Sequence, residues 1–317
     1  MTATQAPMPT TADVVARQIS GRKVPWREVA FEGALLLALL ISLLFLITLL
    51  ADIVIKALPV LTERPVDFLG GELSPDPARA GVGTAILGSV VITLGVAMLS
   101  FPLGMGTAVY MEEYSTDSWL TRFISTNIRN LAGVPSIVFG ILGFAVFVRV
   151  VVAVGLGGSV NGRNVFAAGM TLSALVLPIV IITSAEALRA VPNSIREAGF
   201  GVGATRWEVT RHHVLPYAAP GILTGTVLTL SRAFGETAPL LLVGAVTGFF
   251  TLGEGAGAMD KLTSAYTALP VTIFSWSRQP DADFRALAAA AIVALLLVLL
   301  TANAAAIILR NRYERKW

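Results

Sequence analysis

An arginine and a glutamate interrupt an otherwise apolar stretch of the sequence, LTLSRAFGETAPLLLVGA, at residues 228–245. A charged side chain at the centre of a bilayer costs roughly 2.5–3.5 kcal/mol on insertion scales. Because Arg232 and Glu236 are four residues apart, they share one face of a continuous helix and can neutralise each other there. A planar guanidinium is also well matched to the oxygens of an oxyanion. We therefore expect the pair to line a translocation path for an anion, with a structural ion pair between helices as the alternative.

Two residues of the segment AGVPSIVFG, Pro135 and Ser136, are weaker candidates for the same path. They can offer backbone and hydroxyl groups to a passing substrate. Small residues in membrane helices more often permit close helix packing, and that alternative is the simpler one.

The sequence offers little for catalysis or metal binding. Its two histidines, His212 and His213, are adjacent, so their side chains diverge on a helix, and the chain contains no cysteine. A Walker A loop needs a lysine that follows a glycine, and none of the lysines in this sequence does. We therefore expect no metal site, no bound cofactor and no catalytic centre in this chain.

The elements that must position Arg232 and Glu236 are membrane helices. Charged residues make up only 14% of the 317 residues, against roughly a quarter in soluble domains. A helix needs ~20 apolar residues to cross a bilayer. Uncharged runs of about this length or more lie between Glu32 and Asp52, Arg79 and Glu112, Asn130 and Arg149, Arg163 and Glu186, and Arg285 and Arg310. With the segment over 217–250 as the sixth, the sequence predicts an all-α integral membrane protein with six transmembrane helices.

The distribution of basic residues predicts the topology. With six crossings, both chain ends lie on one side, which carries fourteen of the 23 Lys and Arg residues against eight on the other side. Because the side richer in Lys and Arg is usually cytoplasmic, we expect both termini in the cytoplasm. The basic pI of 9.4 then reflects topology and not a nucleic-acid partner. The expected parts are a cytoplasmic tail over 1–32, a transmembrane domain over 33–310 and a second tail over 311–317.

Local signals refine several segments. Pro102 and Gly104 predict a kink or break near the end of the second span, and residues 112–130 predict a short interfacial helix. Phe274 and Trp276 suit the membrane interface on the opposite side. The spans themselves are expected over 33–51 (at most to 58), from 83, from 131, over 165–185, over 217–250 and over 286–309.

The longest cytoplasmic loop, residues 189–216, carries the most informative pattern. Its apolar positions predict a short helix that can fit a groove on a partner; they are Ile195, Ala198, Val202 and Trp207. The order Glu197-Ala198-Gly199, Gly203, Leu215-Pro216 resembles the E-A-A, G, I-x-L-P loop of importer permeases in the ABC transporter superfamily. Gly199 stands in place of the third small residue and His213 in place of the isoleucine. An ordinary amphipathic surface helix is the alternative.

Further segments narrow the resemblance. AGVPSIVFG at 132–140, RAFGETAPLL at 232–241, the stretch over 276–284 and the C-terminal tail resemble the PstA-type permease subunits of phosphate ABC importers, from about residue 83 to the C-terminus. The sister PstC-type subunits share VPSIVFG and the core from arginine to GET. The continuation after Glu236, Thr-Ala-Pro-Leu, favours the PstA type.

The resemblance implies a MetI-like, type I ABC permease core over about 83–307 in a prokaryotic inner membrane. This chain would form half of the translocation path and would not be an enzyme, because a partner subunit uses the ATP. The implied partners, besides membrane lipid, are a PstC-type sister permease, two copies of a PstB-type ATP-binding subunit and a PstS-type phosphate-binding protein outside. The ATPase-docking loop would comprise Glu197, Ala198, Gly203, Leu215 and Pro216.

Two alternatives remain at this point. One is an ABC permease subunit for another oxyanion, such as phosphonate or molybdate. The other is a self-sufficient secondary anion transporter or channel. A secondary transporter would need its own coupling-ion carboxylates, and Glu236 alone in the membrane is a poor supply.

Overall fold

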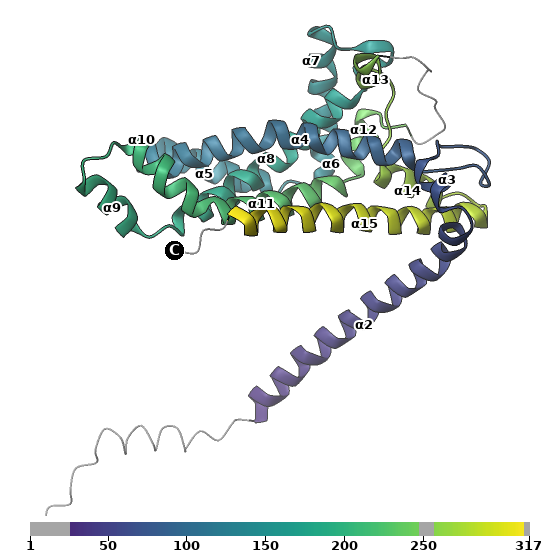
Figure 1. The fold of residues 1–317 in the computed structure, drawn as a ribbon, viewed down its shortest axis with the longest axis horizontal. Helices are drawn as coiled ribbons and strands as arrows, with labels where there is room; N and C mark the ends of the chain where they lie inside the picture. The colour runs from purple at the N-terminus through teal and green to yellow at the C-terminus, as the bar shows by residue number, and fades with distance from the viewer. Residues whose placement is uncertain (1–25, 247–256, 314–317) are drawn as a thin grey trace, which may run out of the picture. The chain divides into compact units, whose positions relative to one another are not determined.

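The computed structural model describes residues 26–246 and 257–313 (Figure 1). Within these ranges the chain is helical and contains no β-strand. The elements are α2 (Trp26–Glu63), α3 (Pro65–Gly70), α4 (Gly83–Val109), η1 (Tyr110–Tyr114), α5 (Trp119–Ala132), α6 (Ser136–Leu142), η2 (Gly143–Phe147), α7 (Val148–Ala153), η3 (Gly158–Val160), α8 (Val165–Arg189), α9 (Asn193–Gly201), α10 (Arg206–Val209), η4 (Thr210–Val214), α11 (Leu215–Phe234), α12 (Ala238–Val243), α13 (Ala258–Thr263), α14 (Leu269–Ser277) and α15 (Ala282–Tyr313). The chain divides after Asp52 into two compact units, which are described separately.

The described part of the first unit is the N-terminal portion of α2. This helix begins at Trp26, earlier than the apolar run alone predicts, and continues to Glu63. Every side chain over residues 26–52 is exposed, although α2 contains the most apolar window of all six candidate spans, with a mean hydropathy of 3.0. A helix that is apolar on all sides requires lipid or another protein around it. The rest of the predicted N-terminal tail, residues 1–25, lies outside the described residues.

Helix α8 is the centre of the second unit. It contacts α4 and α11, and α11 contacts α15, so these four long helices lie side by side (Figure 1). Glycines allow the close approach. A Cβ on Gly104 of α4 would fall 2.6 Å from Cγ1 of Val180, and one on Gly225 of α11 would fall 2.6 Å from Cβ of Thr183. Because 61% of the most apolar window of α8 is buried, this span is surrounded mainly by protein.

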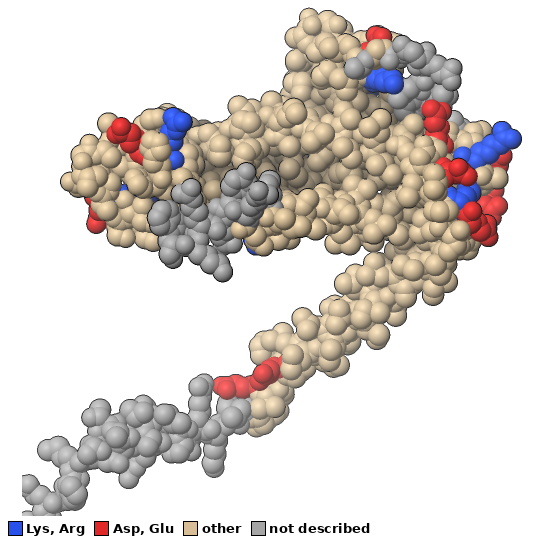
Figure 2. All heavy atoms as spheres, viewed as in Figure 1, with Lys and Arg blue, Asp and Glu red and all other residues tan. Residues whose placement is uncertain are grey.

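Six segments are long and apolar enough to cross a membrane: Trp26–Glu63, Gly83–Tyr114, Ser136–Ala153, Val165–Arg189, Arg206–Phe234 and Ala282–Ile308. On the face of the second unit seen in Figure 2, charged atoms gather near the two ends of the long helices and beside α13, and an uncharged surface lies between them. The predicted all-α fold with six transmembrane helices is thereby confirmed.

Of the kink or break predicted at Pro102 and Gly104, the break is wrong. Helix α4 runs through both residues to Val109 and continues into the π-helical turn η1. Proline is tolerated inside membrane bundles because neighbouring groups and local π adjustments satisfy the freed carbonyl groups. Gly104 permits the close contact with α8.

Aromatic side chains were predicted at the membrane interface on both sides. Trp276 is 3% exposed and packs against Phe284, with ring centroids 6.1 Å apart, so protein encloses its ring, whereas Phe274 is 39% exposed. The place of these two residues at the membrane interface stays a prediction. The predicted short helix over 112–130 is found as α5, which begins later, at Trp119. Its exposed aromatic rings Trp119 and Phe123 stack with centroids 5.8 Å apart, as expected for an interfacial surface.

Candidate functional site

The helix that carries Arg232 ends before Glu236. Helix α11 stops at Phe234, Gly235 is its C-cap, and α12 begins at Ala238. Pro239 explains the break, because its ring would clash with the carbonyl of the residue four positions earlier, Gly235, and it has no N–H to donate. The prediction that Arg232 and Glu236 share one face of a continuous helix is therefore wrong.

The two charges nevertheless come together. Nε of Arg232 lies 3.6 Å from Oε1 of Glu236, so the carboxylate folds back across the break. The Glu236 side chain is 16% exposed and the Arg232 side chain 56%. The pair is therefore asymmetric: the carboxylate is held within the protein, and the guanidinium projects from the surface of this chain.

A second helix break lies at Pro135 and Ser136, the other two residues predicted to line the path. Helix α5 ends at Ala132, Pro135 is the N-cap of α6, and Ser136 is its first residue. Pro135 is exposed and Ser136 half-buried, and the Ser136 hydroxyl forms no hydrogen bond with another described residue.

The two helix breaks meet in one buried cluster. Val134 and Phe139 flank Pro135 and Ser136, and they pack together with Ala233 and Leu240, which flank the break at Gly235. A Cβ on Gly140 would fall 2.8 Å from the Cα of Pro239, so α6 and α12 touch backbone to backbone. The expectation that small residues here permit close packing is confirmed. The structure thus places two discontinuous helices side by side, with Arg232 at one of the breaks.

The loop over 189–216 folds as two short helices, α9 and α10, ahead of α11. Glu197 and Ala198 are exposed on α9. Gly203 has a φ of +83°, the left-handed conformation that favours glycine, and its N–H donates to the carbonyl of Phe200 at 3.0 Å to end the helix. Leu215 and Pro216 begin α11 directly after the π turn η4. This turn contains His212, whose carbonyl would otherwise meet the Pro216 ring.

One surface of this loop is apolar and uncovered. Phe200 is 46% exposed, Val202 85% and Trp207 54%. Ile195, predicted with them, packs instead against the buried cluster at this end of the second unit. We call Glu197, Ala198, Phe200, Val202 and Trp207 the loop face. His212 and His213 are exposed nearby, and the described residues contain no group of three or more His, Asp or Glu side chains that could hold a metal ion.

Gly199, which departs from the E-A-A pattern, has a clear structural reason. It is buried, and a Cβ at this position would lie 2.7 Å from Cγ2 of Val209. Glycine therefore lets α9 lie directly against α10.

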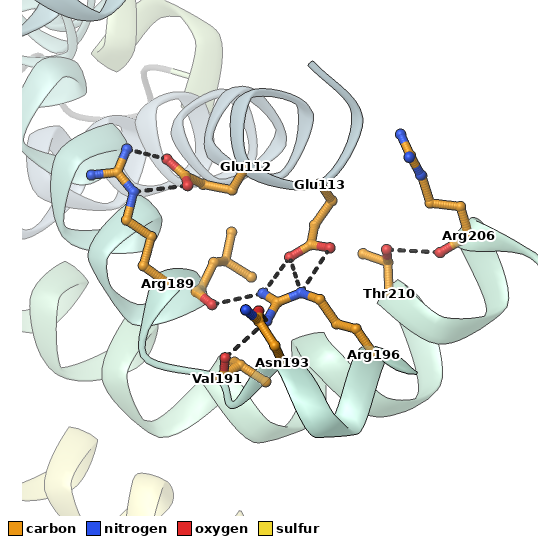
Figure 3. Close-up of polar contacts among 9 residues, drawn as sticks. Glu112, Glu113, Arg189, Val191, Asn193, Arg196, Arg206 and Thr210 are labelled. Carbon is orange, nitrogen blue, oxygen red and sulfur yellow. Dashed lines mark hydrogen bonds and ion pairs between the residues drawn. The ribbon is translucent and has the colours of Figure 1, made fainter. Parts of the chain in front are cut away.

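Two ion pairs hold the loop to the long helices, and the sequence analysis missed them (Figure 3). Nη2 of Arg196 on α9 lies 2.7 Å from Oε1 of Glu113 in η1, and the two side chains are only 18% and 7% exposed. Arg196 also donates to the carbonyls of Leu188 at 2.9 Å and Val191 at 2.8 Å. One guanidinium thus joins α9, the end of the second span and the carbonyls left open at the end of α8. We call this arrangement the Arg196 clamp.

The second pair lies beside the first. Arg189 donates from Nε and Nη2 to the two carboxylate oxygens of Glu112, at 2.8 and 2.5 Å. Arg189, the last residue of α8, thus pairs with a residue of the second span, and Glu186 is exposed. No spacing rule predicts partners 77 and 83 residues apart. The only available signal was the Glu-Glu sequence directly after an apolar run.

A family model described as binding-protein-dependent transport system inner membrane component matches residues 100–316. The phosphate transport system permease protein PstA of Yersinia pestis is 32% identical over 305 residues, which cover 94% of this chain and 95% of that protein. The permease protein PstC of Haemophilus influenzae is 30% identical over 69% of this chain and 75% of its own length.

Among solved structures, the MetNI methionine ABC transporter in an inward-facing conformation matches with a TM-score of 0.57 and 17% identity, covering 74% of this chain and 96% of that one. At this identity the match shows the fold alone, and it is the predicted MetI-like permease fold. The chain therefore belongs to the family of inner membrane components of binding-protein-dependent transport systems.

Proposed function

We propose that this chain is the PstA-type permease subunit of an ATP-driven phosphate importer in a prokaryotic inner membrane. The observation that carries the proposal is the Arg232–Glu236 pair at a helix break inside an apolar bundle, in a chain related to a PstA permease over 94% of its length. Broken membrane helices supply polar groups at substrate sites in many transporters. A permease of this kind needs a second permease, and we infer a PstC-type sister subunit.

Arg232 is the residue we assign to the translocated anion. Its guanidinium is more than half exposed in the single chain, and the 3.6 Å contact with Glu236 is longer than a hydrogen bond. The arginine can therefore turn toward phosphate oxygens while Glu236 competes for it, so the anion is not trapped. Pro135 and Ser136 lie at the neighbouring break and are assigned to the wall of the same path.

The loop face is the surface we assign to the ATP-binding subunit. It combines one carboxylate, Glu197, with three exposed apolar side chains, a composition suited to a groove on a partner protein. The chain has no Walker A lysine, so ATP is bound and hydrolysed by two copies of a PstB-type subunit. This places the loop and both termini in the cytoplasm, and a PstS-type protein delivers phosphate on the opposite side.

The Arg196 clamp then links docking to the path. Arg196 precedes Glu197 directly, and its side chain holds the ends of the second and fourth spans. A shift of α9 with the ATP-binding subunit is therefore transmitted to α4 and α8 through a charge-assisted contact that is mostly buried.

Uptake of labelled phosphate tests the proposal. Cells that lack this chain should take up phosphate only when it is restored, and phosphonate or molybdate in excess should compete poorly. The Glu197→Lys variant should remain in the membrane but lose the co-purifying ATP-binding subunit. Concentrative uptake by the purified chain alone, without an ATP-binding subunit, would contradict the proposal, and strong competition by molybdate would reassign the substrate.

A further inference from the structure

A cavity of about 560 Å³ shares no described lining residue with either helix break or with the loop face. It is formed where four segments meet: the η2–α7 segment, the turn before α8, the residues that follow α12 and Ala265 after α13. Its lining includes Phe144, Arg149, Asn161, Arg163 and Gly244. In the proposed topology this cavity opens on the side away from the cytoplasm, because α8 starts beside it and ends at Arg189 next to the docking loop.

The described residues place two positive charges and no negative one at this cavity. Both Arg149 and Arg163 are exposed, and neither has a hydrogen bond or ion pair with another described side chain. No Asp or Glu is among the described residues that line the cavity. In contrast, Arg189, Arg196 and Arg232 each face a carboxylate.

Arg149 lies in an unfavourable place for an unpaired charge. It interrupts the apolar run FAVFVRVVVAV, residues 144–154, and its neighbour Val150 is 39% exposed. An arginine at membrane depth without a partner is costly, and such residues mark ion or substrate pathways. The cavity supplies the water or the counter-ion that this side chain needs.

Arg163 is held so that its N–H groups remain free. Its guanidinium lies over the ring of Phe144, with Cζ 5.1 Å from the centroid. A stacked guanidinium keeps its donors in its own plane, where they can bind a second partner. The stem of Arg163 lies against Gly244, which has a φ of +103° and where a Cβ would fall 2.9 Å from Cβ of Arg163.

The cavity is close to the helix break through α12. This helix starts two residues after Glu236 and ends at Val243, directly before Gly244. At 1.5 Å per residue, its six residues span about 9 Å. The part of the cavity wall at Gly244 is therefore one short helix away from the break that Arg232 and Glu236 flank.

We propose that Arg149 and Arg163 form a receiving site for a tetrahedral oxyanion, which holds the anion on the outer side before it reaches Arg232. The inference deepens the proposed function and rests on its assignment of the outer side. Two guanidinium groups match the charge of hydrogen phosphate, and a cavity lined by charges of one sign raises the local concentration of anions and their rate of arrival.

Transport by the reconstituted complex gives the first test. Proteoliposomes with this chain, its sister permease, the ATP-binding subunit and the binding protein are compared for wild type, Arg149→Gln, Arg163→Gln and the double variant. Arg278→Gln is the matched control, because Arg278 also stacks on an aromatic ring, 5.2 Å from the centroid of Phe274, but does not line the cavity. We expect the double variant to lower the uptake rate at limiting phosphate roughly tenfold and to weaken its salt dependence. The control should do neither.

Chemical protection gives a second test that needs neither a variant nor transport. The purified wild-type complex is treated with phenylglyoxal, which modifies arginine, and the modified peptides are quantified by mass spectrometry. Inorganic phosphate should slow the modification of Arg149 and Arg163 but not of Arg278, and chloride at equal ionic strength should not.

The outcomes separate this inference from the proposed function. Unchanged uptake by the double variant, together with no protection, overturns the receiving site even if wild type imports phosphate. Loss of binding-protein association in the double variant, or protection by the binding protein without phosphate, assigns the arginines to carboxylates of a partner and also overturns it. If wild type imports no phosphate, the proposed function fails, and protection of both arginines by phosphate still supports an oxyanion site.

Discussion

Arg196 and Glu113, 83 residues apart in the sequence, form a mostly buried ion pair that joins the 189–216 loop to the second span. The same guanidinium caps two carbonyls at the end of α8. One side chain therefore joins η1, at the end of the second span, to α8 and to α9, which follows α8 after three residues. We expect a movement of α9 to reach both long helices through this contact.

Breaking this pair should uncouple ATP hydrolysis from transport. Arg196→Lys keeps the charge but loses the fork that reaches the carboxylate and both carbonyls at once. We expect ATP hydrolysis by the reconstituted complex to persist while phosphate uptake falls roughly tenfold, and we expect Glu113→Gln to do the same. Removing one partner of a buried pair costs about 3–5 kcal/mol, so the melting temperature should fall as well.

The control for this prediction is the pair between Arg122 and Asp117. Both side chains are mostly exposed, at 72% and 83%, and such pairs contribute about 0–1 kcal/mol. Arg122→Gln should change neither the ratio of ATP hydrolysed to phosphate transported nor the melting temperature. A fall of hydrolysis and uptake in equal proportion in Arg196→Lys would show that the clamp only stabilises the fold.

A second prediction concerns the translocation path. Arg232→Gln should abolish most phosphate uptake, by at least tenfold, while the complex assembles normally, because the neutral amide cannot attract the anion into an apolar path. Arg232→Lys should retain part of the activity, since it keeps the charge but not the paired donors. Labelled-phosphate uptake with immunoblotting of membrane fractions measures both quantities.

Its control is the adjacent residue, Ser231. The Ser231 hydroxyl is 2.6 Å from Oδ1 of Asn303, which ties α11 to α15. Ser231→Ala should lower stability by about 1 kcal/mol and leave uptake nearly intact. Normal uptake by a well-assembled Arg232→Gln variant would reduce the Arg232–Glu236 contact to a structural ion pair.

The sequence predicts the spans well and their interruptions poorly, and the reason is physical. A run of about twenty uncharged apolar residues can satisfy its backbone in lipid only as a helix, so the runs alone locate six spans. A proline has no single outcome: α4 continues through Pro102, whereas the helix ends before Pro239, where Gly235 provides the C-cap. Tertiary neighbours decide between these outcomes, and the sequence does not contain them.

The residues of the candidate site likewise fall into those that the sequence predicts and those that it does not. Arg232 and Glu236 stand out because a charge in an apolar run is rare, and the loop stands out because its glycines and Glu197 follow a spacing pattern. Arg196 and Glu113 belong to ordinary polar segments at helix ends. Their pairing arises only when the second span and the 189–216 loop meet in space, so no local sequence pattern predicts it.

A third prediction concerns the contact between α6 and α12. Gly140→Ala places a Cβ 2.8 Å from the backbone of Pro239, which cannot move aside as a flexible side chain would. Such overpacking costs about 1–3 kcal/mol, so the melting temperature of the complex should fall. Gly106→Ala on α4 is the control, because no atom of this chain lies within 4 Å of its added Cβ. This control should be neutral or slightly stabilising, since alanine favours a helix interior by up to about 1 kcal/mol.

The last prediction distinguishes two reasons why glycine is present at two positions of the 189–216 loop. Gly203 has a φ of +83°, whereas Gly201 is the final residue of α9 with an ordinary helical backbone and no atom within 4 Å of an added Cβ. If backbone conformation is the reason, Gly203→Ala should strain the turn by about 1–2 kcal/mol and reduce the amount of co-purifying ATP-binding subunit, and Gly201→Ala should not. Loss of the subunit in Gly201→Ala would instead show that the partner's backbone approaches α9 at this glycine. Pull-down of the ATP-binding subunit with each variant, normalised to the amount of this chain in the membrane, distinguishes the two.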